Sequence, residues 1–488
     1  MLNTDLQSYE IVILGAGFGG LGMGAQLKMR GIENFIILER GDRIGGVWRE
    51  NNYPGAACDT ESHLYCYSFY PHLRVSKMYA DRDELLRYLD AMASRYELMD
   101  HISLDTELVR AQWNEEANEW DFELGDGRSL KGRFFVPAWG QLNRPVVPGF
   151  KGLDSFAGQY FHSAQWPADI DLVGKKVASI GAAASAVQYV PEVAKVASQL
   201  TVFQRSANWI MPRNQIVFTQ QELDAFERTP DLFMQSRNKL HAFREDGYAR
   251  TRHGTDAQKE GIKMAIAHLA AQVPDEALRA KLVPDYEFAC KRILRSDDYY
   301  PALTRENVAL ETAAVAEFTP EGIVDEEGKR HAFDVVIFGT GFASQAFQGD
   351  LQVVGREKQT LHSRWAEGAE AYLGMSVPGF PNMLMIYGPN TNLNHNSIIS
   401  LLEIQQRYII QVIEGLAHSR QAIDVKQDKF DSFNDRLQTN MLSSAFSSEC
   451  SSWYKNAAGK IINNWSGTLD EYEVLTAKWQ SDDYNYLS

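Results

Sequence analysis

The chain has 488 residues, a net charge of −16 and a hydrophobic content of 44%. Its length exceeds that of a single compact core and predicts two or three lobes, and its acidity argues against nucleic acid as a partner. It lacks both an apolar run of about 18 residues and a signal-peptide pattern, so we expect no membrane association and a cytoplasmic enzyme.

The first predicted strand ends in a glycine-rich turn. Apolar residues 11–14 lead into Gly15, Gly17 and Gly20, and Glu39 closes the next apolar strand, 24 residues after Gly15. A strand, a glycine turn and a helix N-terminus form a cradle for pyrophosphate, and a carboxylate at the next strand end accepts hydrogen bonds from a free ribose 2′-hydroxyl. This pattern predicts FAD binding, with a tight turn that holds no ligand as the alternative.

A predicted hairpin and a loop then end the first lobe. Residues 119–124 alternate apolar with polar side chains and run into the turn 125–127, which indicates a hairpin. Residues 134–138 read as a buried strand, and the Pro- and Gly-rich loop 144–149 as a lobe boundary.

A second glycine turn follows a second apolar strand, residues 177–180. It begins at Gly181, has Ala183 where a middle glycine would lie, and is followed by Arg205, 24 residues after Gly181. An arginine at this strand end favours a ribose 2′-phosphate, so the turn predicts NADPH. Because Ala183 departs from the glycine pattern, a purely structural turn is the alternative.

The remaining chain predicts a helical insertion and a return to the first lobe. Residues 220–285 are dense in Glu, Arg, Lys, Ala and Leu, which favours helices that shape a substrate entrance or only cover the outside. Residues 333–338 read as a strand that ends near Thr340 and Gly341, much as 134–140 do, which suggests that the first lobe resumes. We expect an α/β protein with two Rossmann-like dinucleotide-binding domains, divided into 1–155 (FAD), 156–325 (NADPH, with the insertion) and 326–488 (FAD, second part).

Cysteine and histidine usage predicts neither a disulfide framework nor a metal site. Cys58, Cys66, Cys290 and Cys450 contain no Cys-x-x-Cys pair, so we expect buried apolar thiols in a reducing compartment. No His pair has the spacing of a zinc site.

Several segments resemble type I Baeyer–Villiger monooxygenases over nearly the whole chain. The segment Gly45–Asp59 is similar to the family's segment after the first glycine turn. The segments Gln141–Pro145 and Gly388–Asn392 resemble its 4-hydroxyacetophenone monooxygenase branch. The family fingerprint between the lobes is matched by Phe156, Gly158, His162, Trp166 and Pro167.

The resemblance implies an oxidoreductase that uses FAD, NADPH and O₂ to convert a ketone to an ester or lactone through a C4a-peroxyflavin. Arg292 corresponds to the active-site arginine, whose charge stabilises the anionic peroxyflavin, and Asp59 to the carboxylate that orients it. From the residues alone, Asp59 could equally form a turn. Oxygenation of nitrogen or sulfur, which Trp166 and Pro167 disfavour, and an uncoupled NADPH oxidase or redox-sensing flavoprotein are the alternative functions.

The same resemblance implies that Lys291 joins Arg205 and Ser206 around the NADPH 2′-phosphate. From the residues alone, Lys291 and Arg292 could instead be exposed to solvent, as adjacent Lys and Arg residues usually are. We expect His162 and Trp166 to hold the lobe geometry rather than to contact substrate. The residues expected to bind a cofactor are Gly15, Gly17, Gly20, Glu39, Gly46, Trp48, Asp59, Tyr65, Gly181, Ser185, Arg205, Ser206, Lys291, Thr340 and Gly341.

Overall fold

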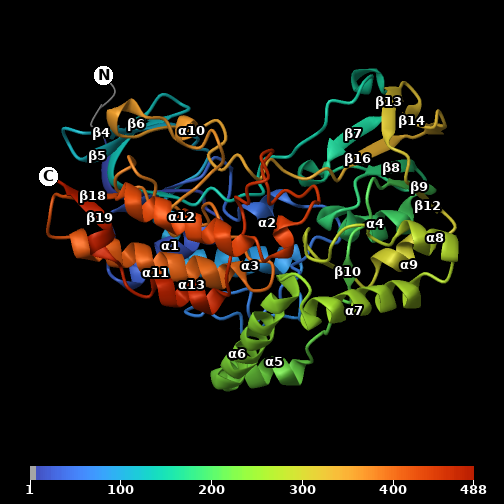
Figure 1. The fold of residues 1–488 in the computed structure, drawn as a ribbon, viewed down its shortest axis with the longest axis horizontal. Helices are drawn as coiled ribbons and strands as arrows, with labels where there is room; N and C mark the ends of the chain where they lie inside the picture. The colour runs from blue at the N-terminus through green and yellow to red at the C-terminus, as the bar shows by residue number, and fades with distance from the viewer. Residues whose placement is uncertain (1–6) are drawn as a thin grey trace.

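A computed structural model describes residues 7–488, so residues 1–6 of the expected first lobe lie outside the described residues. Figure 1 shows two lobes side by side, one with β4–β6, α1 and α11 and the other with β7–β9 and α4, and helices α5–α7 below them. The chain is α/β, as expected; its first sheet combines parallel with antiparallel strand pairs, and its second sheet is parallel. Within residues 7–488, no helix combines the length and apolarity needed to cross a membrane.

The first sheet has seven strands in the order β17-β4-β5-β6-β1-β2-β3. Strand β1 pairs in parallel with β2 and β6, and Ile11, Val12 and Ile13 at its centre are fully buried, as is typical of a parallel sheet covered by helices. Helix α1 (Phe18–Met29) leaves the end of β1 and packs against α11 (Ile398–Leu416). The strands are β1 (Gln7–Leu14), β2 (Phe35–Leu38), β3 (Ile102–Ser103), β4 (Leu108–Asn114), β5 (Glu119–Leu124), β6 (Ser129–Pro137) and β17 (Gln352–Val354).

The second sheet has five parallel strands in the order β12-β9-β8-β16-β7. Its strands are β7 (Gln159–His162), β8 (Lys176–Ile180), β9 (Gln199–Phe203), β12 (Val308–Glu311) and β16 (Val335–Phe338). Helix α4 (Ala184–Val196) starts where β8 ends.

Strand β16 corrects one expectation. We expected it to begin the resumed first lobe, but it lies between β8 and β7 in the second sheet (Figure 1). The first strand to rejoin the first sheet is β17, which pairs with β4. An apolar strand that ends in glycine suits either sheet, and only distant pairing partners decide which one it joins.

The insertion contains helices that begin at polar caps. Thr219, Thr255 and Asp275 each accept a hydrogen bond from a backbone N–H in the first turn of the following helix, a common N-cap arrangement. The helices are α5 (Gln220–Arg228), α6 (Pro230–Asp246), the short 3₁₀ helix η4 (Gly247–Thr251), α7 (Asp256–Gln272) and α8 (Glu276–Lys281).

The remaining elements connect or cover the two sheets. Helix α3 contacts α1 and α2, and α13 packs against α11 (Figure 1). These elements are α2 (Val47–Glu50), α3 (Arg82–Arg95), β10 (Ile210–Met211), β11 (Leu294–Arg295), α9 (Tyr299–Leu303), β13 (Val315–Thr319), β14 (Gly322–Asp325), β15 (Arg330–Ala332), α10 (Leu361–Arg364), β18 (Ala422–Val425), α12 (Gln427–Met441), α13 (Leu469–Thr476) and β19 (Tyr484–Leu487).

Candidate active site

A cavity of about 750 Å³ lies where the two sheets and the insertion meet. Its walls include both glycine turns, the segment 46–65 and the loop 392–396. The structure places most of the predicted site residues in its lining: Gly15, Gly17, Glu39, Gly46, Trp48, Asp59, Tyr65, Ser185, Arg292, Thr340 and Gly341. The remaining predicted residues, Gly20, Gly181, Arg205, Ser206 and Lys291, lie outside this lining.

The first glycine turn has the geometry of a dinucleotide cradle. Gly15 has φ +101°, and a Cβ there would lie 2.7 Å from the carbonyl oxygen of Ala138. Gly17 precedes α1, and a Cβ there would lie 3.4 Å from the Cα of Gly46. Because these glycines bring backbone N–H groups and a helix N-terminus to the cavity wall, the turn fits a pyrophosphate.

Glu39 is held at the end of β2 by backbone donors. Its two carboxylate oxygens accept hydrogen bonds from the N–H groups of Ala16, at 2.9 Å, and Gly41, at 2.8 Å. The guanidinium of Arg49 lies 3.1 Å from it, and Glu39 is only 6% exposed. The carboxylate is therefore fixed in place where the FAD ribose is expected.

Trp48 and Tyr65, both predicted to bind a cofactor, contact each other in the cavity wall. The indole N–H of Trp48 donates a hydrogen bond to the Tyr65 hydroxyl at 3.2 Å, and the two rings meet edge to face. Burial raises the pKa of Tyr65 well above its ordinary value, so its hydroxyl stays protonated. These two rings give one end of the cavity an aromatic wall.

The second glycine turn has the same backbone geometry as the first at its initial glycine, but it does not require glycine at its third position. The Gly181 N–H donates to the carbonyl of Phe203 at the end of β9, just as the Gly15 N–H donates to Leu38. Gly181 has φ +107°, and a Cβ there would collide with the carbonyl of Gly339. Ala183 has φ −87°, in the ordinary range for an alanine that precedes a helix. The backbone therefore tolerates alanine at this position.

Three residues predicted to bind a phosphate lie together beside the second turn. The Lys291 ammonium donates a hydrogen bond to the Ser206 hydroxyl at 3.1 Å and lies 4.3 Å from the ring centre of Tyr286. Burial lowers the pKa of Lys291, and the charge of nearby Arg205 lowers it further. Arg205 itself is exposed. Two cations held close together in this way are suited to a doubly charged anion.

Arg292 and Asp59 form an ion pair in the cavity wall. The Arg292 Nε lies 3.1 Å from Asp59 Oδ2, and a second guanidinium nitrogen donates to the same oxygen. About a third of each side chain is exposed, 34% for Arg292 and 30% for Asp59. Both residues line the cavity, so the pair is accessible from it.

The ion pair keeps both partners charged. Burial alone would raise the pKa of Asp59, but the charge and hydrogen bonds of Arg292, together with the charges of Arg244 and Arg295, hold the pKa below its ordinary value. Asp59 in turn raises the pKa of Arg292 above its ordinary value. The guanidinium therefore presents a permanent, oriented positive charge to the cavity.

The residues of the fingerprint between the lobes lie outside the cavity lining. His162 is 1% exposed, and its Nδ1 accepts a hydrogen bond from the Ala164 N–H at 3.1 Å. Trp166 packs edge to face on Phe161, and its carbonyl accepts a hydrogen bond from Asn52 in the first lobe. These contacts agree with a role in holding the lobes rather than in contacting substrate.

The sequence analysis missed several cavity residues. Arg244, Arg250 and Thr251 reach the cavity from the insertion, whose sequence indicated helices at a substrate entrance or on the outside but singled out no residue. Gln188 on α4 joins the lobes. Its side-chain NH₂ donates a hydrogen bond to the Ala57 carbonyl, and its side-chain oxygen accepts one from the Tyr53 hydroxyl, each at 2.9 Å. Because none of them belongs to a motif, only the folded arrangement reveals them.

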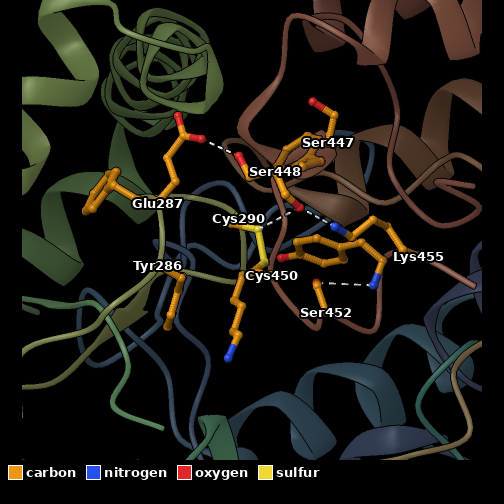
Figure 2. Close-up of a disulfide and its surroundings, with 12 residues drawn as sticks. Tyr286, Glu287, Cys290, Ser447, Ser448, Cys450, Ser452 and Lys455 are labelled. Carbon is orange, nitrogen blue, oxygen red and sulfur yellow. Dashed lines mark hydrogen bonds between the residues drawn. A yellow bond between two sulfur atoms is a disulfide. The ribbon is translucent and has the colours of Figure 1, made fainter. Parts of the chain in front are cut away.

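The cysteines correct a second expectation. We expected four thiols, but Cys290 and Cys450 form a disulfide across 160 residues, with their Cα atoms 6.3 Å apart. Figure 2 shows that it joins the segment just before Lys291 to the loop of Ser448 and Lys455. The missing Cys-x-x-Cys motif excludes only a disulfide between neighbouring cysteines, whereas this disulfide joins two segments that are distant in the sequence. Cys58 and Cys66 are free and buried, as expected.

Comparisons with known proteins are consistent with this geometry. Residues 8–224 match the family model described as flavin-binding monooxygenase-like. The chain is 35% identical to a Baeyer–Villiger monooxygenase of Pseudomonas aeruginosa over 479 residues, which cover 98% of this chain and 91% of that protein. It is 36% identical to a Baeyer–Villiger monooxygenase of Streptomyces coelicolor over 484 residues, covering 98% and 92%.

Among solved structures, the chain resembles an oxidised steroid monooxygenase bound to NADP. The TM-score is 0.88 at 27% identity, and the superposition covers 99% of this chain and 100% of the other. The similarity therefore extends over both lobes and the insertion.

Proposed function

The chain belongs to the Baeyer–Villiger monooxygenases, and from this premise we propose that its cavity binds a ketone beside Arg292 and converts it to an ester or lactone. The enzyme is an FAD- and NADPH-dependent monooxygenase. The observation that supports a ketone substrate is the Arg292–Asp59 ion pair in the cavity wall. A fixed cation at this place suits a reaction in which a carbonyl oxygen becomes negative.

The protein residues supply placement and charge. When bound, the two cofactors supply the reducing electrons and the activation of O₂. Arg292 donates hydrogen bonds toward the ketone oxygen and stabilises the negative charge that forms there as the carbonyl carbon is attacked. Asp59 holds the guanidinium in orientation and remains ionised, since its pKa lies below the ordinary value. One oxygen atom enters next to the carbonyl, and the other leaves as water.

We assign the cofactor residues by their position in the cavity. Gly15, Gly17 and Gly20 would hold the FAD pyrophosphate, and Glu39 the adenosine ribose. The flavin ring would lie against Gly46, Trp48 and Tyr65. NADPH would contact Gly181, Ser185, Thr340 and Gly341, with its 2′-phosphate on Arg205, Ser206 and Lys291.

The domain division follows the sheets. Since β16 belongs to the second sheet, we place the NADPH-binding domain at 156–339 rather than at 156–325. The FAD-binding domain would then comprise the chain before residue 156 and the chain from residue 340 onward.

Labelled oxygen tests the proposed reaction. Purified enzyme is incubated with NADPH under ¹⁸O₂, with acetophenone in one sample and thioanisole in another. We expect phenyl acetate that carries one ¹⁸O atom. If only the sulfoxide forms, the enzyme oxygenates soft nucleophiles instead. If only hydrogen peroxide accumulates with either compound, the enzyme is an uncoupled oxidase.

A further inference from the structure

The part of the cavity beside Asp59 contains more arginines than carboxylates. Four arginines line it, and they are faced by Asp59 in the lining and by Glu61 behind it. These arginines are Arg244, Arg250, Arg292 and Arg295. In a chain whose net charge is −16, this local excess of positive charge is unusual.

Two of the four arginines use the available carboxylates. Arg292 pairs with Asp59. Arg244 lies 2.7 Å from the Glu61 carboxylate, and it also donates a hydrogen bond to the Asp59 carbonyl at 3.3 Å. Both carboxylates are therefore taken.

The other two arginines lack an ionic partner. Among residues 7–488, no carboxylate oxygen lies within 4.0 Å of Arg250 or Arg295. Arg295 donates one long hydrogen bond, 3.4 Å, to the carbonyl of Pro212, and Arg250 stacks 5.7 Å from the ring centre of Phe243. Burial lowers the pKa of both groups, and the charge of Arg244 lowers it further. Glu61 and Asp59 offset only part of this shift at Arg295. Partly buried guanidinium groups without a carboxylate in direct contact are costly, so an anion would stabilise them.

Arg250 is presented to the cavity by an anchored segment. It lies on η4, where the Tyr248 hydroxyl donates to the Ser466 carbonyl at 2.6 Å and the Tyr248 ring meets the ring of His395 in the cavity wall. The Thr255 hydroxyl donates to the Ala249 carbonyl at 2.7 Å. Because these bonds fix the backbone just before Arg250, the place from which its side chain reaches the cavity is set before a ligand arrives.

The predicted NADPH phosphate site does not account for this charge. Its cations, Arg205 and Lys291, lie outside the cavity lining, whereas Arg250 and Arg295 lie within it. Arg244 donates a hydrogen bond to the Asp59 carbonyl, and its charge lowers the pKa of both Arg250 and Arg295, so these two arginines lie near the Asp59–Arg292 pair. The free positive charge therefore lies on the side of the proposed reacting centre.

We propose that the ketone substrate carries a carboxylate, which pairs with Arg250 while Arg295 adds a second positive charge nearby. The proposal rests on the proposed ketone oxygenation and specifies the class of ketone, a keto acid. A planar guanidinium binds a carboxylate through two parallel hydrogen bonds, so the pairing fixes the orientation of the substrate as well as its affinity.

Two ketones that differ in charge and by one methyl group test this proposal. We suggest 4-acetylbenzoate and its methyl ester, titrated into FAD-loaded enzyme that is saturated with NADP⁺, with the change in flavin absorbance as the readout. Saturation with NADP⁺ keeps the cofactor phosphates in their own site. We expect the carboxylate to bind at least about tenfold more tightly than the ester, as one charge-assisted pair implies. Equal affinities would overturn the proposal.

Substitution of Arg250 locates the effect. In Arg250→Met, 4-acetylbenzoate should lose its advantage while the ester binds as before; the control Arg228→Met, on an exposed surface of α5, should keep the advantage. If Arg250→Met fails to retain FAD, Arg295→Met is expected to reduce the same preference. A retained preference in Arg250→Met, or a rise in the KM for NADPH as large as the loss of carboxylate binding, would contradict the assignment.

Product analysis separates this proposal from the proposed function. A carboxylate preference in binding without ester formation would support the anion site and contradict ketone oxygenation. Ester formation from both ketones, with equal affinity, would support ketone oxygenation and contradict the anion site.

Discussion

The two glycine turns share one backbone geometry and differ in how tightly their surroundings close on it. Each begins with a glycine at φ above +100°, +101° for Gly15 and +107° for Gly181, whose N–H donates to the end of the neighbouring strand. Beyond that position they diverge. Gly17 abuts Gly46, whereas Ala183 carries a side chain at the equivalent place.

The charged residue that follows each turn differs in the same way. Glu39 is buried and held by two backbone donors and Arg49. Arg205 is exposed at the end of β9. A ligand bound by the first turn meets preorganised groups, whereas the second turn must order an exposed side chain on binding. The first site is therefore suited to a cofactor that stays bound, and the second to one that exchanges during turnover.

Arg292 lies between the two sites, and its removal should have the largest effect. We expect Arg292→Ala to lower ester formation by about 10²–10³ or more, as the loss of a preorganised charge at a reacting centre implies. FAD content and flavin reduction by NADPH should remain, since neither glycine turn is altered. Ester formation is measured by product analysis, and flavin reduction by anaerobic stopped flow. Normal ester yield in this variant would refute the role of Arg292.

The Cys290–Cys450 disulfide joins the segment next to Lys291 to a loop of the C-terminal part, and its loss should come next in size. It restrains a loop of 160 residues, so Cys450→Ser should lower the free energy of unfolding by about 2–4 kcal/mol. Chemical denaturation of the FAD-loaded enzyme measures this difference.

The double variant Cys290→Ser/Cys450→Ser serves as the control. It should be no less stable than Cys450→Ser alone, because the single substitution already breaks the bond. The double variant should not change with reductant, whereas the wild-type protein and Cys58→Ser, which both keep the disulfide, should lose stability when a dithiol is added. An unchanged stability in Cys450→Ser would contradict the tether.

Local patterns predicted both glycine turns because each is a continuous segment with a fixed offset to its charged residue. The first turn follows apolar strand β1, and Glu39 and Arg205 end the next strands in each case. The resemblance likewise brought Asp59 and Arg292 together, although 233 residues separate them.

The features that the sequence analysis missed depend on distant partners. Strand β16 has the same apolar pattern whether it pairs with β8 or with the first sheet, so its place is decided by neighbours that the pattern does not contain. Cys290 and Cys450 meet only because the C-terminal loop returns to the second lobe. Arg250 stands in a helical, charge-rich insertion, and only the fold reveals that no carboxylate among residues 7–488 pairs with it.

Alanine at the first glycine of each turn separates the two sites. Gly15→Ala places a Cβ 2.7 Å from the Ala138 carbonyl at a positive φ, a strain of about 1–3 kcal/mol, so FAD should bind about tenfold or more weakly. Gly181→Ala meets the Gly339 carbonyl in the same way but should raise only the KM for NADPH. Flavin content and steady-state kinetics measure both. If each variant lost both cofactors equally, the turns would not be separate sites.

Arg205→Ala tests the exposed arginine that follows the second glycine turn, and we expect its effect to be the smallest. The KM for NADPH should rise by an amount worth about 1–3 kcal/mol, because the proposed charged hydrogen bonds to the 2′-phosphate are lost. NADH lacks that phosphate, so its KM should change far less. Lys291→Ala should show the same selectivity, since its ammonium lies beside Ser206 in the same cluster. Equal losses with NADPH and NADH would show that Arg205 does not recognise the phosphate, and the second turn would then discriminate between the two cofactors by other groups.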